Sequence, residues 1–559
     1  MHTTRTGAKY IADYFKQREV THVFFMDAIL RRALIEMEDV GITRVLAHSE
    51  AAAAYMADGY ARVSGRPGIC MAQSVGAANL AAGLQDAYLH RSPVLAITGR
   101  KPPGYRNRHA YQEIDHAPLY QPVTKFHADV EDPAELRLML DQAFRAMTSG
   151  APRPAHLDLT GLQGELVETA DINDTLDIDP RYNKVPAFRP PASADDIHHM
   201  AEMFAASCRP MLVAGAGAMH SKAARAIAEF AERYSIPVAT STGGHGCLPT
   251  DHPLHVGIVG NYSSPPANYL LDRADLVIFV GSEVSDQTTM DWTIPGLEVP
   301  KIQIDIDPAE AGRNYPAIYA VAADPRDTIE ALQKAMADQQ RYTSWADEVR
   351  SAVSQWQKAA DELADSQAVP IGAQALCKAV GDALPDNAIL VGDTGFSAIW
   401  SGNAIALRGA GQTYLRAAGS LGWAFPAALG AQCAAPERPV ICFTGDGALY
   451  YHIAELETAR RRNLPVVVVV NNNSAFGQAL GNVRRLLGER DGNIDEMIRF
   501  GPTNFADVAQ AFGVDAIRVE RPGDLANAIG KAIAMRRPVL VDAVTDMESK
   551  VPEPWRRTR

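Results

Sequence analysis

The stretch VICFTGDGALYYHIAELETARRRNLPVVVVVNNN (residues 440–473) contains two apolar runs, and each run ends in polar residues. The first run leads into Gly445-Asp446-Gly447, and the second leads into Asn471-Asn472-Asn473. Between them, apolar side chains recur at helical spacing, which predicts a strand, a helix starting near Ala448, and a second, parallel strand. Because the carboxyl ends of neighbouring parallel strands meet at one edge of a sheet, Asp446 and Asn473 are expected to lie close together.

The chemistry of these two side chains indicates a metal-held phosphate. Carboxylate and carboxamide oxygens are the hard ligands that Mg²⁺ takes when it also binds phosphate. Glycines on both sides of Asp446 let the backbone approach an anion, and the following helix points its first amides at the same place. An isolated Gly-Asp-Gly is equally typical of an ordinary polar turn, so the prediction depends on the partner motifs below.

Size and composition favour a multidomain enzyme acting on small molecules. The chain has 559 residues, too many for one core, and three domains are the prediction. A net charge of −13 opposes binding to nucleic acid or to an anionic membrane. Six cysteines without a Cys-x-x-Cys pair and an N-terminus without an apolar signal region favour a cytoplasmic location.

Apolar runs alternate with amphipathic stretches along the whole chain, which predicts parallel sheets covered by helices. The proline-rich segment DPRYNKVPAFRPPAS (179–193) reads as a linker, and residues 339–366 read as a polar helical connector. We therefore expect three doubly wound α/β domains at residues 1–180, 190–340 and 366–559. The predicted strands are 23–25, 44–46, 68–71, 94–97 and 155–159, then 211–214, 236–238, 276–280 and 301–307, then 388–391, 440–443, 466–470 and 538–541.

A second motif, HSEAAAAYMADGYAR (48–62), lies where a strand gives way to an alanine-rich helix. A carboxylate such as Glu50 at a helix N-terminus is favoured by the dipole without any catalytic role, and Ser49 is expected to cap the helix. The stretch nevertheless resembles the His-Glu-x-x-Ala-x-x-x-Ala-x-Gly-Tyr-Ala-Arg signature of thiamine diphosphate (ThDP) enzymes, with Ser49 in place of the usual His. That family also carries Gly-Asp-Gly followed by Asn-Asn, with the spacing seen between Asp446 and Asn473. The resemblance covers essentially the whole chain.

The resemblance implies roles for individual residues. Glu50 is the expected catalytic residue, which hydrogen-bonds the pyrimidine ring of ThDP and promotes loss of the thiazolium C2 proton. Asp446, Asn473 and the carbonyl of Ala475 are the expected Mg²⁺ ligands. GSLGWAFPAALG (419–430) resembles an acetolactate synthase segment in which Leu421 is the apolar wedge under the cofactor, although a buried Leu on a turn is the plainer interpretation. The remaining expected cofactor contacts are Thr394, Gly395, Gly419, Gly445, Gly447, Ala448 and Phe476.

Substrate contacts are less well marked. After the first strand the chain reads FFMDAIL (24–30), without the loop glycines and proline that family members carry. Either Ile29 and Leu30 make an apolar pocket, or the loop runs differently. Tyr111-Gln112-Glu113 resembles the family's Phe-Gln-Glu, so Gln112 is the expected polar contact, although such a residue is also common on a plain surface. Gln478 is a further candidate.

The middle region decides whether a second cofactor binds. AGAGA (214–218) follows a strand but lacks the full Gly-x-Gly-x-x-Gly spacing, and such runs commonly provide only close packing. Acetolactate synthases carry Arg-Phe-Asp-Asp-Arg where this chain has SEVSDQT (282–288), although IDIDPAE (304–310) is retained. Binding of FAD is therefore possible but not favoured.

The expected function is ThDP- and Mg²⁺-dependent lyase or transferase chemistry, in which a C–C bond next to a carbonyl of a 2-oxo acid is broken or formed. A 2-hydroxyacyl-CoA lyase or oxalyl-CoA decarboxylase-like activity is the alternative, suggested by Ile29 and Leu30. More remote are a non-catalytic nucleotide- or CoA-binding protein and an NAD dehydrogenase. The resemblance also implies a homodimer or homotetramer, because Glu50 of one subunit would face Asp446 of its partner.

Overall fold

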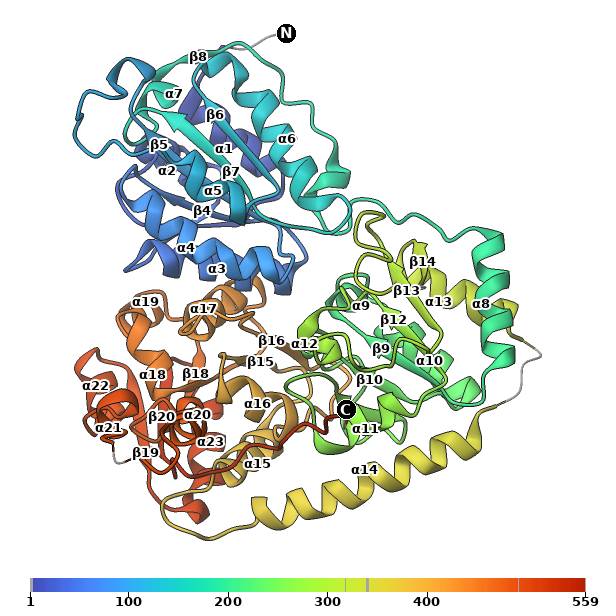
Figure 1. Cartoon of the computed structure of the whole chain (residues 1–559). Coiled ribbons are helices and arrows are strands. Elements are labelled where there is room, and N and C mark those ends of the chain that lie inside the picture. Colours follow the sequence, from blue (N-terminus) through green and yellow to red (C-terminus); the bar gives the residue numbers. More distant parts are fainter. Residues whose placement is uncertain (1–3, 317, 338–340, 491, 558–559) are drawn as a thin grey trace.

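The computed structural model describes residues 4–316, 318–337, 341–490 and 492–557. The predicted boundary at 340 and the start of the connector at 339 lie outside these residues. Three sheets form three lobes, each with its own covering helices (Figure 1). The prediction of three parallel α/β domains is confirmed.

The N-terminal sheet has the order β3-β2-β4-β5-β7-β6, and all its strands are parallel. A short antiparallel pair, β1 with β8, lies beside it. The strands and helices are β1 (Arg5–Thr6), α1 (Gly7–Gln17), β2 (His22–Phe25), α2 (Arg31–Asp39), β3 (Thr43–Leu46), α3 (Glu50–Ser64), β4 (Gly68–Ala72), α4 (Gly76–Leu89), β5 (Val94–Arg100), α5 (Ala117–Tyr120), β6 (Phe126–Val130), α6 (Leu136–Thr148), β7 (Ala155–Thr160), α7 (Glu165–Thr169) and β8 (Asp171–Ile172).

The middle sheet has the parallel order β11-β10-β9-β12-β13-β14. Its elements are α8 (Ala194–Ala206), β9 (Pro210–Ala214), α9 (Ala216–His220), α10 (Ala224–Tyr234), β10 (Val238–Thr240), β11 (His255–Ile258), α11 (Pro265–Asp272), β12 (Leu276–Val280), α12 (Asp286–Thr289), β13 (Lys301–Asp305), β14 (Ile318–Ala322) and α13 (Pro325–Ala335). The long helix α14 (Thr343–Ala364) then crosses to the third domain along one side of the molecule (Figure 1).

The C-terminal sheet has the parallel order β16-β15-β17-β18-β20-β19. Its elements are α15 (Ala373–Ala383), β15 (Ile389–Gly392), α16 (Phe396–Asn403), β16 (Thr413–Arg416), α17 (Ala424–Ala434), β17 (Val440–Gly445), α18 (Asp446–Leu449), α19 (Glu455–Arg461), β18 (Val466–Asn472), α20 (Gly477–Leu487), α21 (Asp495–Ile498), α22 (Phe505–Ala511), β19 (Asp515–Val519), α23 (Leu525–Ala534) and β20 (Val539–Val544).

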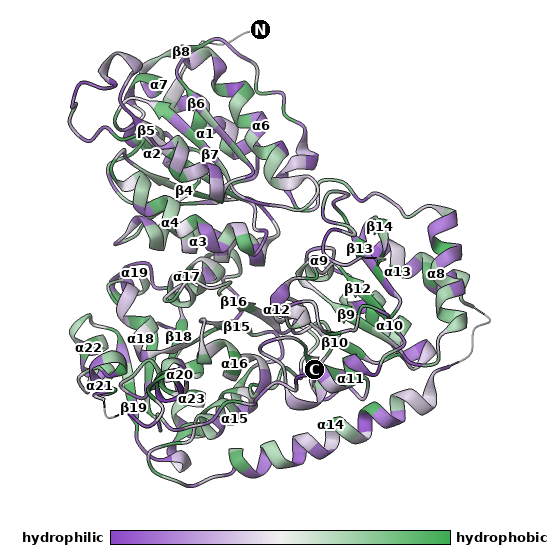
Figure 2. Cartoon of the chain, viewed as in Figure 1, coloured by the Kyte–Doolittle hydropathy of each residue, from purple (hydrophilic) through white to green (hydrophobic). Residues whose placement is uncertain are grey.

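The N- and C-terminal domains share one hydrophobic core through α3 and α17. Glycines allow the two helices to touch: a Cβ on Gly59 would lie 2.1 Å from the carbonyl oxygen of Ala427, and one on Gly430 would lie 1.8 Å from that of Met56. In Figure 2 the central strands are coloured hydrophobic, whereas α14 alternates between polar and apolar residues as a partly exposed helix does. Among the described residues, no helix is both long and apolar enough to cross a membrane.

The segment after residue 545 runs back to the middle domain, where residues up to 557 lie near α11 (Figure 1). The buried amide of Asn268 donates to the carbonyl oxygen of Trp555 at 3.2 Å. The indole of Trp555 packs edge-on against Tyr269, and Arg557 pairs with Glu298 at 3.0 Å. The C-terminal domain is therefore joined to the middle domain at both of its ends.

Candidate functional site

The strand-helix-strand unit predicted at residues 440–473 is present, with β17 and β18 adjacent and parallel. The Oδ2 atom of Asp446 and the Oδ1 atom of Asn473 both accept from the backbone amide of Ala475, at 3.2 and 3.0 Å. Two side-chain oxygens of the type that Mg²⁺ binds therefore converge at the carboxyl edge of the sheet. Burial raises the pKa of Asp446 to about 6, and a bound cation would favour its ionised form.

The helix expected from Ala448 onward is broken. α18 ends at Leu449, a 3₁₀ turn covers Tyr450–His452, and α19 begins at Glu455. At the break the Tyr450 ring packs against Phe505 and Phe500, and its hydroxyl meets that of Thr503 at 2.5 Å. Tertiary contacts of this aromatic side chain prevail over the helical spacing of the apolar residues.

The other expected cofactor contacts surround the same edge. A Cβ on Gly447 would lie 2.6 Å from the ring of Phe476, so only glycine fits there. Gly395 has a left-handed φ of 64°, and a Cβ on it would lie 2.9 Å from Oε1 of Gln478. Thr394, Gly395 and Gly445 are half-buried, whereas Asp446 and Ala448 are buried.

Glu50 is the first residue of α3, and Ser49 caps this helix by accepting from the amide of Ala52 at 3.1 Å, as predicted. The Glu50 carboxylate accepts from the side chain of Asn79 at 3.2 Å. It also lies so close to Gly76 that a Cβ there would be 2.5 Å from Oε1. Among the described residues, no hydrogen bond or ion pair joins Glu50 to Asp446 or Asn473.

Two buried aspartates that the sequence did not single out fix the loop carrying Leu421. Asp86 on α4 accepts from the amides of Ala418, Gly419 and Ser420 at 2.8–3.2 Å. Asp393 accepts from the amides of Thr394, Gly422 and Ala424 at 2.9–3.1 Å, and burial raises its pKa to about 6. Leu421 itself is half-buried, and no atom lies within 4 Å of a Cβ built on Gly419. In the sequence, Asp86 is the one charged residue of α4, a helix rich in alanine and leucine.

Gln112 lies in the loop after β5, with a left-handed φ of 57°. Its carbonyl oxygen accepts from the hydroxyl of Ser74 at 2.5 Å, and its side-chain amide donates to Tyr111 at 3.1 Å. The side-chain oxygen is buried and has no partner among the described residues. Ser74 lies two residues before Gly76, which lies against the Glu50 carboxylate. The hydrogen bond from Ser74 therefore places Gln112 near the N-terminal end of α3, which carries Glu50.

Ile29 and Leu30 are packed in the core, whereas the sequence left open that they line an apolar substrate pocket. Both are 0% exposed and belong to the hydrophobic core of the N-terminal domain. The amide of Leu30 donates to the carbonyl of Gln163 at 2.9 Å, so this loop is held against the turn that follows β7. Their apolar character is accounted for by packing.

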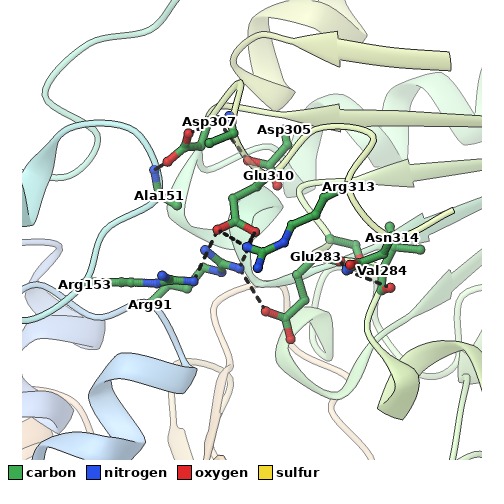
Figure 3. Close-up of polar contacts among 12 residues, drawn as sticks. Arg91, Ala151, Arg153, Glu283, Val284, Asp305, Asp307, Glu310, Arg313 and Asn314 are labelled. Atoms are coloured by element: carbon green, nitrogen blue, oxygen red, sulfur yellow. Dashed lines mark hydrogen bonds and ion pairs between the residues drawn. The ribbon is translucent and has the colours of Figure 1, made fainter. Parts of the chain in front are cut away.

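A separate cavity of about 340 Å³ lies where the three domains meet. It opens at the carboxyl ends of β9, β12 and β13, and the N-terminal domain closes one side. There Arg91 and Arg153 converge on Glu310 of the middle domain, and Arg91 also reaches Glu283 (Figure 3). These ion pairs join the N-terminal and middle domains across the cavity wall.

Three parallel sheets, with two side-chain oxygens meeting after neighbouring strands and a glutamate at the start of a helix, define a class of cofactor-dependent α/β enzymes. The comparison with protein-family models identifies which cofactor-dependent enzymes these are. The models match the N-terminal TPP binding domain of thiamine pyrophosphate enzymes at residues 5–119, the central domain at 197–332, and the C-terminal TPP binding domain at 393–543.

The chain belongs to the thiamine pyrophosphate enzyme family and is similar to acetolactate synthase large subunits. It is 31% identical to a probable acetolactate synthase large subunit of Methanocaldococcus jannaschii, over 92% of this chain and 87% of the relative. It is 30% identical to the acetolactate synthase isozyme 1 large subunit of Escherichia coli (strain K12), over 98% and 95%. It is 29% identical to the large subunit from Corynebacterium glutamicum, over 98% and 88%.

The chain is thus a thiamine diphosphate-dependent enzyme of the carboligase and decarboxylase kind, as predicted. The remote alternatives, a non-catalytic binding protein and an NAD dehydrogenase, are wrong. The acyl-CoA alternative is not favoured, because the relatives are acetolactate synthases and because Ile29 and Leu30, which suggested it, are buried in the core.

Proposed function

We propose that this enzyme is a ThDP- and Mg²⁺-dependent carboligase of the acetolactate synthase kind, acting on a 2-oxo acid. The observation that carries the proposal is the meeting of the Asp446 and Asn473 oxygens at the ends of β17 and β18. Similarity to acetolactate synthase large subunits supports the choice of a 2-oxo acid.

In this proposal Asp446, Asn473 and the carbonyl of Ala475 hold Mg²⁺, and the metal holds the diphosphate. The amides at the start of α18, around Gly447 and Ala448, would face the same anion, as helix N-termini do. Phe476 closes one side, since its ring lies against Gly447. Thr394, Gly395 and Gly445 would complete the diphosphate pocket.

Glu50 is proposed as the catalytic residue, which shares a proton with a pyrimidine ring nitrogen. When bound, ThDP supplies a nucleophilic thiazolium carbon and an electron sink. Leu421 and Gly419 would support the bent cofactor, and the two buried aspartates Asp86 and Asp393 would keep that loop in place. Gln112, with its unpaired side-chain oxygen, and Gln478 are the proposed substrate contacts; Ile29 and Leu30 would act only from beneath the pocket.

We further propose a homodimer or homotetramer in which Glu50 faces Asp446 of the partner subunit. Two features support this. Glu50 has its hydrogen bond within its own domain. Large apolar side chains are also exposed on both domains near the site: Val75, Tyr111, Ile114 and Leu119 on the first, and Tyr450, Tyr451 and Phe476 on the third. Clusters of this kind are typical of subunit interfaces.

The experiment is turnover of pyruvate by the purified protein, with CO₂ and the organic product quantified together. We expect CO₂ and a branched 2-hydroxy-3-oxo acid, and only when ThDP and Mg²⁺ are both present. Release of free acetaldehyde instead would show a decarboxylase, and an absence of turnover with cofactor bound would overturn the choice of donor. Light scattering across a dilution series tests the assembly, and a fully active monomer would contradict it.

A further inference from the structure

A second cavity, of about 750 Å³, lies beside α14, where the middle domain meets the C-terminal domain. Its walls come from α14, from β11 and the start of α11, from α16, and from the returning segment 550–552. α14 passes α11 and α15 along one side of the molecule (Figure 1). The residues proposed above for ThDP, Mg²⁺ and substrate do not line this cavity.

The second half of α14 presents an apolar stripe to the cavity. The buried residues of this helix all lie before Arg350. Beyond that point the cavity-facing apolar residues are half-buried and recur every three or four positions: Val353, Trp356, Ala360 and Ala364. The facing wall consists of buried apolar side chains: Ile258, Trp400 and Ile405. The cavity therefore offers two apolar walls between which the body of a ligand can lie.

One buried hydroxyl of the cavity wall has no partner. Ser264 lines the cavity and is 1% exposed, and its Oγ makes no hydrogen bond within the described residues. It occupies the N-cap position of α11, where a serine ordinarily accepts from the amide of the second or third helical residue. Here Pro265 and Pro266 have no N–H group, and the amide of Ala267 donates to the Ser264 carbonyl at 3.2 Å. The hydroxyl is therefore free to bind a ligand.

A second polar atom lies in the same wall. Nε2 of His255 is buried without a partner among the described residues, and burial lowers the pKa of this side chain to about 4. The imidazole is therefore neutral at pH 7 and can donate or accept, depending on its tautomer. Glycine at position 257 keeps the space beside the hydroxyl open, since a Cβ there would lie 2.7 Å from Oγ of Ser264. A hydroxyl and a neutral imidazole suit a ligand oxygen that carries no charge.

The charged side chains that line the cavity are exposed or half-buried: Asp251, Arg350, Asp361, Lys378, Arg408 and Lys550. Arg350 pairs with Asp347 at 3.0 Å. Lys378 and Arg408 share Asp382, at 2.7 and 3.1 Å. Among the described residues of the cavity wall there is thus no buried Asp, Glu, Lys or Arg whose charge a ligand would have to offset. The wall favours a neutral molecule, because burying a ligand charge there would be costly.

We propose that this cavity binds a neutral, largely apolar molecule that carries a hydroxyl or carbonyl oxygen. The apolar body lies between α14 and α16, and the oxygen hydrogen-bonds with Ser264 and His255. Leaving the Ser264 hydroxyl buried without a partner is unfavourable, and a ligand oxygen removes that cost. The ligand contacts both domains, since Ser264 belongs to the middle domain and α16 to the C-terminal domain.

Calorimetric titration of the ThDP- and Mg²⁺-saturated protein with 2-naphthol tests the proposal. Naphthalene lacks the hydroxyl of this probe, and 2-naphthoate carries a charge in its place. We expect 2-naphthol to bind and 2-naphthoate to bind more weakly. Ser264→Ala should weaken binding of 2-naphthol by about 3- to 10-fold, the effect of one net hydrogen bond, and leave naphthalene unaffected. This variant should unfold at the same denaturant concentration as the wild type, because the hydroxyl makes no hydrogen bond within the described residues.

Ala360→Trp places a large side chain in the cavity from α14 and should abolish binding of 2-naphthol. Gln355→Trp is the matched control, since Gln355 is an exposed residue of the same helix that does not line the cavity, and it should bind the probe as the wild type does. If neither Ser264→Ala nor Ala360→Trp altered the affinity for 2-naphthol, the probe would bind elsewhere and the proposal would be overturned. No binding of 2-naphthol, as expected if the hydroxyl bonds only to water, or tighter binding of 2-naphthoate would also overturn it. The result does not depend on the proposed function, because the cavity shares no residue with the proposed ThDP pocket.

Discussion

Replacing Asp86 by Asn tests how the loop before Leu421 is held. The carboxylate is buried and receives four donors: the amides of Ala418, Gly419 and Ser420, and Nη2 of Arg62 at 3.1 Å. An Asn keeps the shape but offers one accepting oxygen and one donating NH₂ group. Two of the four donors must then face another donor. At about 1–3 kcal/mol for each unsatisfied buried group, the free energy of unfolding should fall by roughly 2–6 kcal/mol.

The effect should extend to the cofactor, because Leu421 follows the released segment directly. We expect Asp86→Asn to bind ThDP more weakly in calorimetric titration and to unfold at lower denaturant concentration. Asp382→Asn is the control: Asp382 pairs with Lys378 on an exposed helix face, where such pairs contribute less than about 1 kcal/mol. If the two variants were equal in stability and in ThDP affinity, the assignment of Asp86 as the anchor of this loop would be refuted.

Three further predictions concern single side chains. Glu50→Gln should leave ThDP bound but slow proton exchange at thiazolium C2 by about 10²–10⁴-fold, followed by NMR after quenching; exchange at the wild-type rate would leave Glu50 with only a capping role. Asp446→Ala should abolish ThDP retention in the presence of Mg²⁺, and full occupancy after metal removal would disprove the metal assignment. Burial lowers the pKa of His245 to about 3, below the unfolded value of about 6.5, so its contribution to stability is present above pH 6.5 and is lost as the pH falls. At about 1.4 kcal/mol per pH unit, His245→Phe should gain about 2 kcal/mol relative to the wild type between pH 7.5 and pH 5 in denaturant unfolding, and parallel pH profiles would contradict this.

The sequence predicts the central strands of each sheet and one edge strand, β3, but it misses the other five edge strands, β6, β11, β14, β16 and β19. All five have mixed or partly exposed burial patterns, as in β14 and β19, whereas central strands such as β9 and β12 are buried throughout. A strand covered on both faces reads as a continuous apolar run, and an edge strand does not.

The proximity of Asp446 and Asn473 could be predicted because the two residues follow adjacent strands, β17 and β18, that are close in sequence. The local sequence is therefore enough to place them side by side. Asp86 and Asp393 could not be found in this way. Asp86 reaches a loop more than three hundred positions further along the chain. Such contacts depend on how the domains pack on each other, and a single charged residue in a largely apolar helix does not identify its partner.

The return of the C-terminal segment to the middle domain adds a non-covalent connection to the covalent one made by α14. The third domain begins after α14, which packs beside α11, and its last residues bind Asn268 and Glu298 of the same middle domain. If the tail detaches, α14 still keeps it at a high local concentration, so rebinding is an intramolecular event. The middle domain can therefore swing away from the third domain only if these tail contacts break, together with direct contacts such as the hydrogen bond from Asn403 to the carbonyl of Tyr262 at 2.9 Å. Shortening the chain before Trp555 would remove one of these restraints and make such opening easier.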